Sequence, residues 1–215
     1  MMNRKKEREE LIKRLFEHGY IKSRKVLIAM KKVPREEFVP EWQRRYAYDD
    51  RPLEIGYGQT ISAPHMVAIM TDALDVKKNH KILEVGSGSG YQAAILAEIA
   101  KSGKIFTVER IAEIAKFAEE NLKKCGYENV SVIIGDGTLG YEKEKPYDRI
   151  IVTAAAPKIP KPLIEQLKED GKLLIPVGNR GYQDLILIEK NSEGKIKESN
   201  LGGCIFVPLI GKEGW

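Results

Sequence analysis

The spacing of apolar positions changes along this 215-residue chain. In residues 7–17, and from Ser23 through Met30, apolar side chains recur every three or four residues, which predicts two amphipathic helices. Gly19 is expected to end the first helix, and Ser23 to cap the second. Residues 40–61 have no helical period and contain two prolines and two glycines, so we expect an ordered loop with short strand pieces there.

From Ser62 onward, short apolar runs alternate with helical patterns. The expected strands are residues 81–85, 104–108, 130–134, 148–152, 172–177, 185–189 and 204–207. The expected helices are residues 66–74, 91–101, 111–124 and 162–168, and a turn is expected at 191–194. This alternation predicts an α/β fold with a doubly wound, Rossmann-like sheet and right-handed crossovers, preceded by an N-terminal helical extension.

Charge and composition narrow the class of protein. The 36 basic residues exceed the 31 acidic ones by only five, and they are interleaved along helical faces, which favours a solvated surface over a nucleic-acid site. No apolar run approaches the roughly 18 residues that cross a bilayer, and the charged start lacks a secretory apolar region. The two cysteines, Cys125 and Cys204, are far apart and near no histidine cluster. We therefore expect a cytoplasmic protein with no nucleic acid, membrane or metal partner.

Three glycines follow the first strand of the alternating region. Gly86, Gly88 and Gly90 open the next helix, where glycine lets the backbone turn tightly and approach a ligand. Their spacing is GxGxG, whereas dinucleotide sites carry GxGxxG, and Glu84 precedes them inside the strand. A carboxylate there repels a pyrophosphate but attracts a sulfonium or an amino group. The ligand is therefore expected to be cationic.

Acidic residues also close the next two strands. Glu109 ends the second strand and is expected to accept hydrogen bonds from ribose hydroxyls, while Asp136 follows the third and is expected to bind an adenine amino group. Glu109 is also compatible with a helix N-terminal charge, and Asp136 with an ordinary turn. The combination predicts S-adenosylmethionine as cofactor. The expected contacts are Glu84, Gly86, Ser87, Gly88, Ser89, Gly90, Glu109, Arg110, Asp136 and Gly137.

The segment after the fourth strand bears on the methyl acceptor. Residues 153–157 read Thr-Ala-Ala-Ala-Pro, without the Asn-Pro-Pro-aromatic group that binds an exocyclic amine of a base. The chain also lacks an obvious general base near the loop, apart from His65. A carboxylate acceptor is already ionised at neutral pH and needs no base.

The sequence resembles the protein-L-isoaspartate O-methyltransferase family from about Val33 to its C-terminus. The most specific part of the resemblance is Gln59 to Met66. The segments that carry it are residues 57–66, 83–90, 135–137, 147–148, 154–157, 173–178 and 206–209. Glu84 is a slight departure from the family pattern, because some relatives carry aspartate at this position.

The resemblance implies roles for residues outside the glycine loop. The counterpart of Ser62 is the active-site residue of the family, so Ser62 is assigned as catalytic. Locally, Ser62-Ala63-Pro64 is also typical of a helix start with serine as the N-cap, and the two roles are compatible. His65 is expected to face the cofactor, although a structural role is equally open. Further cofactor contacts are expected at Gln59, Thr60, Ile61, Ser62 and His65, and the substrate groove at Ile55, Tyr57, Gly58, Ser62, Val207, Pro208 and Leu209.

The implied activity is methyl transfer from S-adenosylmethionine to the free carboxylate of L-isoaspartyl residues, as protein repair. The partners would be isoaspartyl proteins and peptides, and the chain is expected to be a monomer. Two alternatives stay open: a methyltransferase for RNA or a small molecule, favoured by the isoelectric point of about 9.0, and a non-catalytic binding module. We expect one domain, residues 1–215, with an extension and substrate loop (1–61), a cofactor-binding core (62–190) and a groove-forming tail (191–215).

Overall fold

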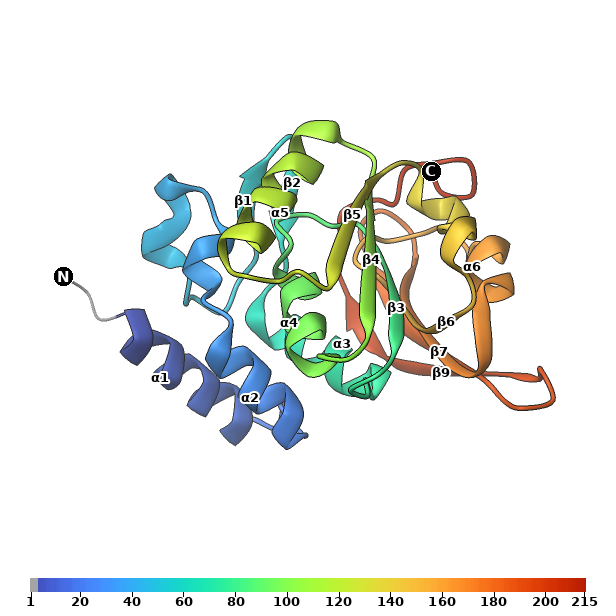
Figure 1. Cartoon of the computed structure of the whole chain (residues 1–215), viewed down its shortest axis with the longest axis horizontal. Coiled ribbons are helices and arrows are strands. Elements are labelled where there is room, and N and C mark those ends of the chain that lie inside the picture. Colours follow the sequence, from blue (N-terminus) through green and yellow to red (C-terminus); the bar gives the residue numbers. More distant parts are fainter. Residues whose placement is uncertain (1–3) are drawn as a thin grey trace.

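A seven-stranded sheet forms the centre of the computed structural model, which describes residues 4–215 (Figure 1). Residues 1–3, part of the charged start, lie outside the described residues. The strand order is β5-β4-β3-β6-β7-β8-β9, and only β8 runs antiparallel to its two neighbours. The strands are β3 (Lys81–Val85), β4 (Lys104–Glu109), β5 (Val130–Ile134), β6 (Tyr147–Val152), β7 (Leu167–Gly178), β8 (Gln183–Lys190) and β9 (Ile196–Cys204).

Strand β3 is the middle of the parallel region and is buried on both faces. Ile82 belongs to the core on one side of the sheet, and Leu83 and Val85 belong to the core on the other. A strand covered on both faces needs a nearly continuous apolar sequence, because neither row of side chains meets water. Glu84 interrupts that run on the Ile82 side, since successive side chains of a strand alternate between faces.

Helices cover both faces of the sheet, as Figure 1 shows. Helices α3 (Pro64–Leu74), α4 (Tyr91–Ile99) and α5 (Ala112–Lys124) lie on one face, and α6 (Lys161–Glu165) lies on the other. Helices α1 (Arg4–Glu17) and α2 (Arg24–Lys32) form an outer layer beside α4. Covered by α2 outside and by the sheet inside, α4 buries nearly its whole surface, which explains its uniformly apolar sequence. A hairpin of β1 (Leu53–Gly56) and β2 (Gln59–Ile61) precedes α3.

The predicted α/β doubly wound class is confirmed, and most predicted elements are found within a few residues of their expected ends. Ser23 caps α2 as expected, since its hydroxyl accepts the Val26 N–H at 3.3 Å. The strand predicted at 204–207 is wrong: β9 ends at Cys204, because the tight turn after β8 makes it pair from Ile196 onward. The helix predicted at 162–168 is shorter, because β7 begins at Leu167.

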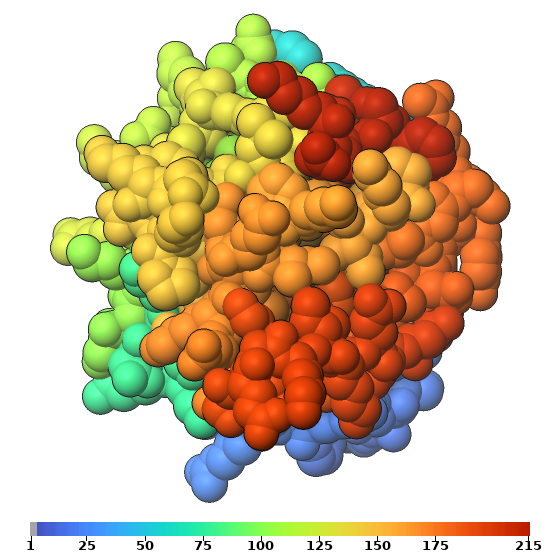
Figure 2. Space-filling model, turned by 90° about the vertical axis from the view of Figure 1, so that its right-hand side faces the viewer, coloured from blue at the N-terminus to red at the C-terminus, as the bar shows by residue number. Residues whose placement is uncertain are grey.

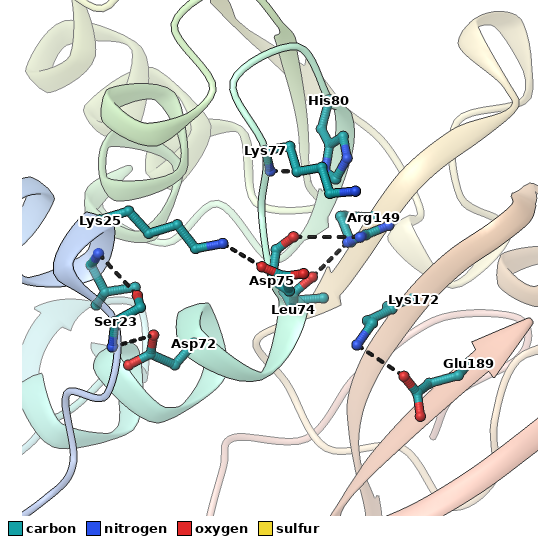
Figure 3. Close-up of polar contacts among 11 residues, drawn as sticks. Ser23, Lys25, Asp72, Leu74, Asp75, Lys77, His80, Arg149, Lys172 and Glu189 are labelled. Carbon is teal, nitrogen blue, oxygen red and sulfur yellow. Dashed lines mark hydrogen bonds and ion pairs between the residues drawn. The ribbon is translucent and has the colours of Figure 1, made fainter.

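The amino end of the sheet is closed by polar contacts around Arg149, which Figure 3 shows in close-up. The Arg149 side chain is buried and donates to the carbonyl oxygens of Leu74, Asp75, Asp148 and Asp170 at 2.5 to 3.4 Å. These carbonyls belong to the end of α3, to β6 and to β7, so one side chain joins three elements.

The C-terminal segment after β9 crosses the opposite end of the molecule. Figure 2 shows it in dark red along the upper edge, with blue residues of the N-terminal helices at the lower edge. The Trp215 indole N–H donates to the Ala155 carbonyl at 3.1 Å, and the Trp215 backbone N–H donates to the Leu209 carbonyl at 2.9 Å. Among residues 4–215, none of the helices is both long and apolar enough to span a membrane.

Candidate active site

The carboxyl ends of β3 and β6 form the point at which the strand order reverses. The chain leaves β3 toward β4 and later returns to β6 on the other side, and ligands of such sheets bind at this switch point. Gly86 follows β3 with a φ of +92°, and a Cβ atom there would lie 2.5 Å from the hydroxyl of Thr153, which follows β6. Only glycine therefore fits the turn that opens the site.

Two narrow cavities flank this glycine loop. The first, here called the tail-side cavity, is lined by Gln59, Thr60, Val85, Gly86, Gly88, Val108, Glu109, Arg110, Gly137, Thr153, Ala154 and residues 207–210. The second, here called the Glu84 cavity, is lined by Thr60, Ile61, Ser62, Val67, Glu84, Gly86, Ser87, Gly88, Ser89, Tyr91, Gln92 and Thr153. The two share Thr60, Thr153 and the loop glycines, so they are neighbours on either side of the same turn.

Glu84 is the most perturbed acid of the site. Its side chain is fully buried, and neither carboxylate oxygen has a hydrogen-bond partner. The hydroxyl of Thr107, which is paired with Glu84 across β3 and β4, donates to Ser87 Oγ at 2.7 Å. Burial is the main cause that raises the pKa of Glu84 to about 8; Thr107 opposes this rise and the charge of Glu109 adds to it. A buried carboxylate facing a cavity without a partner fits a ligand that brings a cationic group.

Glu109 ends β4 and lies at the tail-side cavity. Its Oε2 accepts the Gly88 N–H at 3.2 Å, and its Oε1 accepts the N–H groups of Arg110 and Ile111 at 2.9 and 3.1 Å. The carboxylate thus ties the glycine loop to the start of α5, which is the helix N-terminal role considered from sequence. Oε2, which accepts one hydrogen bond, still has lone-pair capacity for a hydroxyl donor.

Asp136 has a different environment from the one expected. Its Oδ1 accepts the backbone N–H and hydroxyl of Thr138 at 2.9 and 2.6 Å, and its Oδ2 accepts the Lys212 N–H at 2.9 Å. Although burial alone would raise the pKa of Asp136, the Lys212 and Thr138 donors hold it below its ordinary value. The side chain holds the tail against the turn after β5, while the adjacent Gly137 lines the tail-side cavity.

A wider groove opens on the far side of Thr60 and Thr153. Its volume is about 650 Å³. Most of the lining side chains are apolar, and the groove is lined by Pro52, Thr60, Ser62, Ala63, His65, Met66, Thr153, Tyr182 and residues 203–207. Ser62, Thr60 and Thr153 line both this apolar groove and the Glu84 cavity, so the two spaces meet at these residues.

Ser62 does not cap α3, which corrects the expectation from the Ser-Ala-Pro pattern. The helix begins at Pro64 with Ala63 in the cap position, which has no side-chain hydrogen bond to the helix. One residue farther out, Ser62 is too early in the chain to cap, and its half-buried side chain lines both spaces. The local pattern placed the helix start one residue early.

His65 lies outside the two cavities at the glycine loop and lines the apolar groove. Its Nδ1 donates to Asp50 Oδ1 at 2.9 Å, and its ring packs against Tyr20 with centroids 5.4 Å apart. The structure therefore brings His65 beside Ser62 on the groove, on the side away from the glycine loop.

Several predicted site residues lie outside these three spaces. Gly90 caps α4 with a φ of +86°, and a Cβ there would contact Leu122 of α5 at 3.0 Å. Tyr57 and Gly58 form the exposed turn of the β1-β2 hairpin, and Ile55 is buried beneath it near Gly88.

Other residues of the site were not singled out from sequence. Thr153 lines all three spaces, and Tyr91 lines the Glu84 cavity. The position of Thr153 directly after the fourth strand was a usable signal, because ligands bind beyond strand ends.

Comparison with known proteins decides the family. A sequence model of protein-L-isoaspartate(D-aspartate) O-methyltransferases matches residues 5–214. The chain belongs to this family. A protein-L-isoaspartate O-methyltransferase from Methanopyrus kandleri is 60% identical over 210 residues, covering 97% of this chain and 93% of that protein. One from Methanothermobacter thermautotrophicus is 54% identical, covering 97% of each.

Solved structures of the protein-L-isoaspartate O-methyltransferase family agree in fold. A Plasmodium falciparum chain assigned to these enzymes, in complex with S-adenosyl-L-homocysteine, superposes with a TM-score of 0.84 at 30% identity, covering 94% of this chain and 98% of that one. A second family structure has a TM-score of 0.87 at 29% identity and covers 96% of this chain.

The residues of this family member fit an S-adenosyl ligand. The buried, unpartnered Glu84 carboxylate supplies an acceptor for an amino group, and Glu109 supplies one for hydroxyls. The backbone of Gly86 and Gly137 lines the tail-side cavity, and a Cβ atom at either position would lie 2.5 Å from Thr153 or Val85. The site therefore combines two carboxylates with exposed glycine backbone, and the carboxylates favour a ligand that is a cationic nucleoside.

Proposed function

We propose that this protein transfers a methyl group from S-adenosylmethionine to the free carboxylate of L-isoaspartyl residues in damaged proteins and peptides. Family membership supports this activity. The observation that carries it is the junction at Ser62, where the cavity of the unpartnered Glu84 meets an apolar groove. A methyl donor and a peptide acceptor can approach each other there from opposite sides.

On the donor side, Glu84 would pair with the amino group of the cofactor, and Glu109 would accept its ribose hydroxyls. Bound S-adenosylmethionine would supply an electrophilic methyl group on a sulfonium. Gly86 and Gly88 would let the backbone lie against it, since both glycines line both cavities. Arg110, Gly137 and residues 207–209 would enclose the part that occupies the tail-side cavity. Pairing with a cation would also restore the ionised form of Glu84.

On the acceptor side, the Ser62 hydroxyl would donate a hydrogen bond to the isoaspartyl carboxylate and orient one oxygen toward the methyl carbon. That oxygen would form the new bond to the methyl carbon as the carbon–sulfur bond breaks, with its electron pair going to sulfur. The carboxylate is already ionised at neutral pH, so no base is needed. The chain would act chiefly by positioning and by excluding water, because the groove around Ser62 is mostly apolar.

The product fits a repair role. A methyl ester is more open to attack than a carboxylate, so the neighbouring backbone nitrogen can close a succinimide and release methanol without the enzyme. Hydrolysis of the succinimide returns part of the material to normal aspartyl linkage. One chain supplies both spaces from its described residues, which supports action as a monomer, and the cytoplasmic location stays a prediction from the sequence.

The activity is tested with labelled S-adenosylmethionine and paired peptides that differ only in aspartyl or isoaspartyl linkage. We expect base-labile label on the isoaspartyl peptide alone. Equal labelling of both peptides, or no labelling, would contradict the proposal. An RNA or small molecule labelled in its place would establish the alternative acceptor.

Replacing Ser62 tests the acceptor side separately. Ser62→Ala should lower kcat by about 10- to 100-fold through lost orientation while S-adenosylhomocysteine still binds. Ser192→Ala, in the exposed turn after β8, is the matched control and should behave as wild type. Full activity of Ser62→Ala would remove the assigned role of Ser62.

A further inference from the structure

The first turn of α3 is capped from a distant part of the chain. Ala63 occupies the cap position and has no side chain able to accept a hydrogen bond. Asp50, 15 residues before His65, fills this role: its Oδ1 accepts the His65 backbone N–H at 2.9 Å. Asp50 therefore satisfies one of the helix N–H groups that otherwise lack a partner at a helix start.

The same carboxylate oxygen also holds the side chain of His65. The Nδ1 of His65 donates to Asp50 Oδ1 at 2.9 Å, because a carboxylate can only accept. The ring also packs against Tyr20, with ring centroids 5.4 Å apart. His65 is thus fixed on the wall of the apolar groove at two points.

A second contact fixes the other end of the segment. Arg35 is fully buried, and its Nη2 donates to the Ser62 carbonyl at 2.8 Å, while its Nε donates to the Ala47 carbonyl at 3.0 Å. Its guanidinium lies 4.9 Å from the ring centre of Tyr91, which lines the Glu84 cavity. Burial lowers the pKa of Arg35 to about 10, and the nearby charge of Asp50 is one of the effects that oppose this.

These contacts leave the Ser62 hydroxyl unused by the fold. Within residues 4–215, the Ser62 backbone carbonyl is bound by Arg35, and the cap is supplied by Asp50, so the hydroxyl is required for neither. The residues that make these contacts, Tyr20, Arg35 and Asp50, all precede the β1-β2 hairpin. The N-terminal extension therefore holds the segment from Ser62 to His65 in place.

We propose that Asp50 is a positioning residue for methyl transfer: by capping α3 in place of the residue before the helix, it fixes Ser62 to His65 on the groove and frees the Ser62 hydroxyl for the acceptor carboxylate. The inference rests on the proposed function. Asp50 itself contacts His65, lines none of the three spaces of the site, and is not assigned any contact with the reacting groups.

Three variants test this role. Asp50→Ala removes the cap and should lower kcat for an isoaspartyl peptide by about 10- to 100-fold, as small misplacements at reacting centres do. Asp50→Asn keeps an oxygen that accepts both hydrogen bonds and should recover most of kcat. Asp49→Ala is the matched control, because the neighbouring Asp49 side chain is also exposed and pairs only with Arg51 at 3.1 Å. Where Asp50→Ala does not fold, Asp50→Glu displaces the carboxylate by one methylene and should lose kcat by a smaller factor.

Two further measurements separate positioning from a general loss of structure. S-adenosylhomocysteine affinity should be unchanged in Asp50→Ala, because the ligand contacts assigned to the glycine loop are untouched. In a Ser62→Ala background, Asp50→Ala should cause no additional loss of kcat, because both act through the same hydroxyl. Losses that multiply, or wild-type kcat in Asp50→Ala, would overturn the proposal.

Hydrogen exchange keeps this test independent of the activity. In Asp50→Ala, amides of residues 62–66 should exchange faster, while those of β3 should not change. If wild type fails to methylate the isoaspartyl peptide, the proposed function falls, and the exchange result still decides whether Asp50 holds the segment. Unchanged exchange at residues 62–66 would exclude the positioning role.

Discussion

The two ends of the central sheet bury ionisable side chains of opposite type, one basic and one acidic, and differ in the hydrogen bonds they give them. At the amino end, the buried Arg149 donates to four backbone carbonyls, two of which, those of Leu74 and Asp75, are drawn in Figure 3. At the carboxyl end, Glu84 is at least as deeply buried, and neither of its oxygens receives a hydrogen bond. A buried charged group without partners lowers stability, whereas a fully bonded one joins the elements around it. Arg149 thus stabilises the fold at the amino end of the sheet, whereas Glu84 at the carboxyl end remains free to bind a ligand.

The largest expected effect on stability comes from removing the buried side chain at the amino end. Arg149→Ala should lower the free energy of unfolding by about 3–5 kcal/mol, because it leaves several buried carbonyls without donors and opens a cavity. Urea unfolding measures this loss. The exposed Arg45, replaced by Ala, is the control and should change stability little. S-adenosylhomocysteine affinity of the folded Arg149→Ala protein should stay at the wild-type value; a loss of affinity larger than unfolding explains would break the comparison.

At the carboxyl end, the expected change has the opposite sign. Glu84→Gln should raise the free energy of unfolding at pH 8 by about 2–4 kcal/mol, since a neutral amide replaces a carboxyl that is hard to ionise where it is buried. The same variant should bind S-adenosylhomocysteine more weakly, because a charge partner is lost. The exposed Glu128→Gln is the control for both measurements. Lower stability in Glu84→Gln would show that the carboxylate has a partner in the fold.

The pH dependence follows from the same group. The pKa of Glu84 is about 8 in the folded protein against 4.5 for the ordinary group. Between these values the unfolded chain is ionised while the folded protein keeps its proton, so the contribution of Glu84 to stability falls as pH rises from 4.5 to 8. Unfolding curves across this range should therefore diverge between wild type and Glu84→Gln, with the gap widest at the alkaline end.

A smaller effect tests how closely the glycine loop is packed. Gly86→Ala places a methyl group 2.5 Å from the Thr153 hydroxyl, which is itself held by the Gly86 carbonyl at 2.7 Å. We expect a loss of stability of about 2–3 kcal/mol and weaker S-adenosylhomocysteine binding. Gly194 also has a positive φ, of +78°, but open space around it, so Gly194→Ala isolates the backbone strain at about 1 kcal/mol. Equal losses in the two variants would mean that Thr153 moves aside freely.

The parallel part of the fold could be predicted because its signals are local. The strand from Lys81 to Val85 is found with its predicted bounds, since β3 is buried on both faces and its sequence is almost continuously apolar. The last strand was predicted at residues 204–207, which is wrong, because that prediction also relied on a local apolar run. Residues 205–207 are apolar but line the groove, and Ile205 is 74% exposed, whereas the true strand β9 is mostly polar because it is an edge.

In the candidate site, too, features set by local sequence could be predicted, and features set by contacts between distant segments could not. The positions of Glu84 and Glu109 beside the glycine loop could be predicted from sequence, because strand ends lie together in any sheet of this order. The engagement of Asp136 by Lys212, 76 residues later, and the capping of α3 by Asp50 were not predictable, since both depend on how distant segments pack. The local sequence pattern suggested Ser62 as the cap, because such a pattern carries no information about a cap supplied by a distant residue.

The lining of the apolar groove has a consequence for how such a protein can diversify. Apart from Thr153, the groove is lined by residues of two segments, 52–66 and 182–207, while the glycine loop contributes none. Insertions or exchanges in those two segments would reshape the acceptor side and leave Glu84, Gly86 and Glu109 in place. A new acceptor can thus be acquired by changing these two segments, with the methyl donor inherited unchanged.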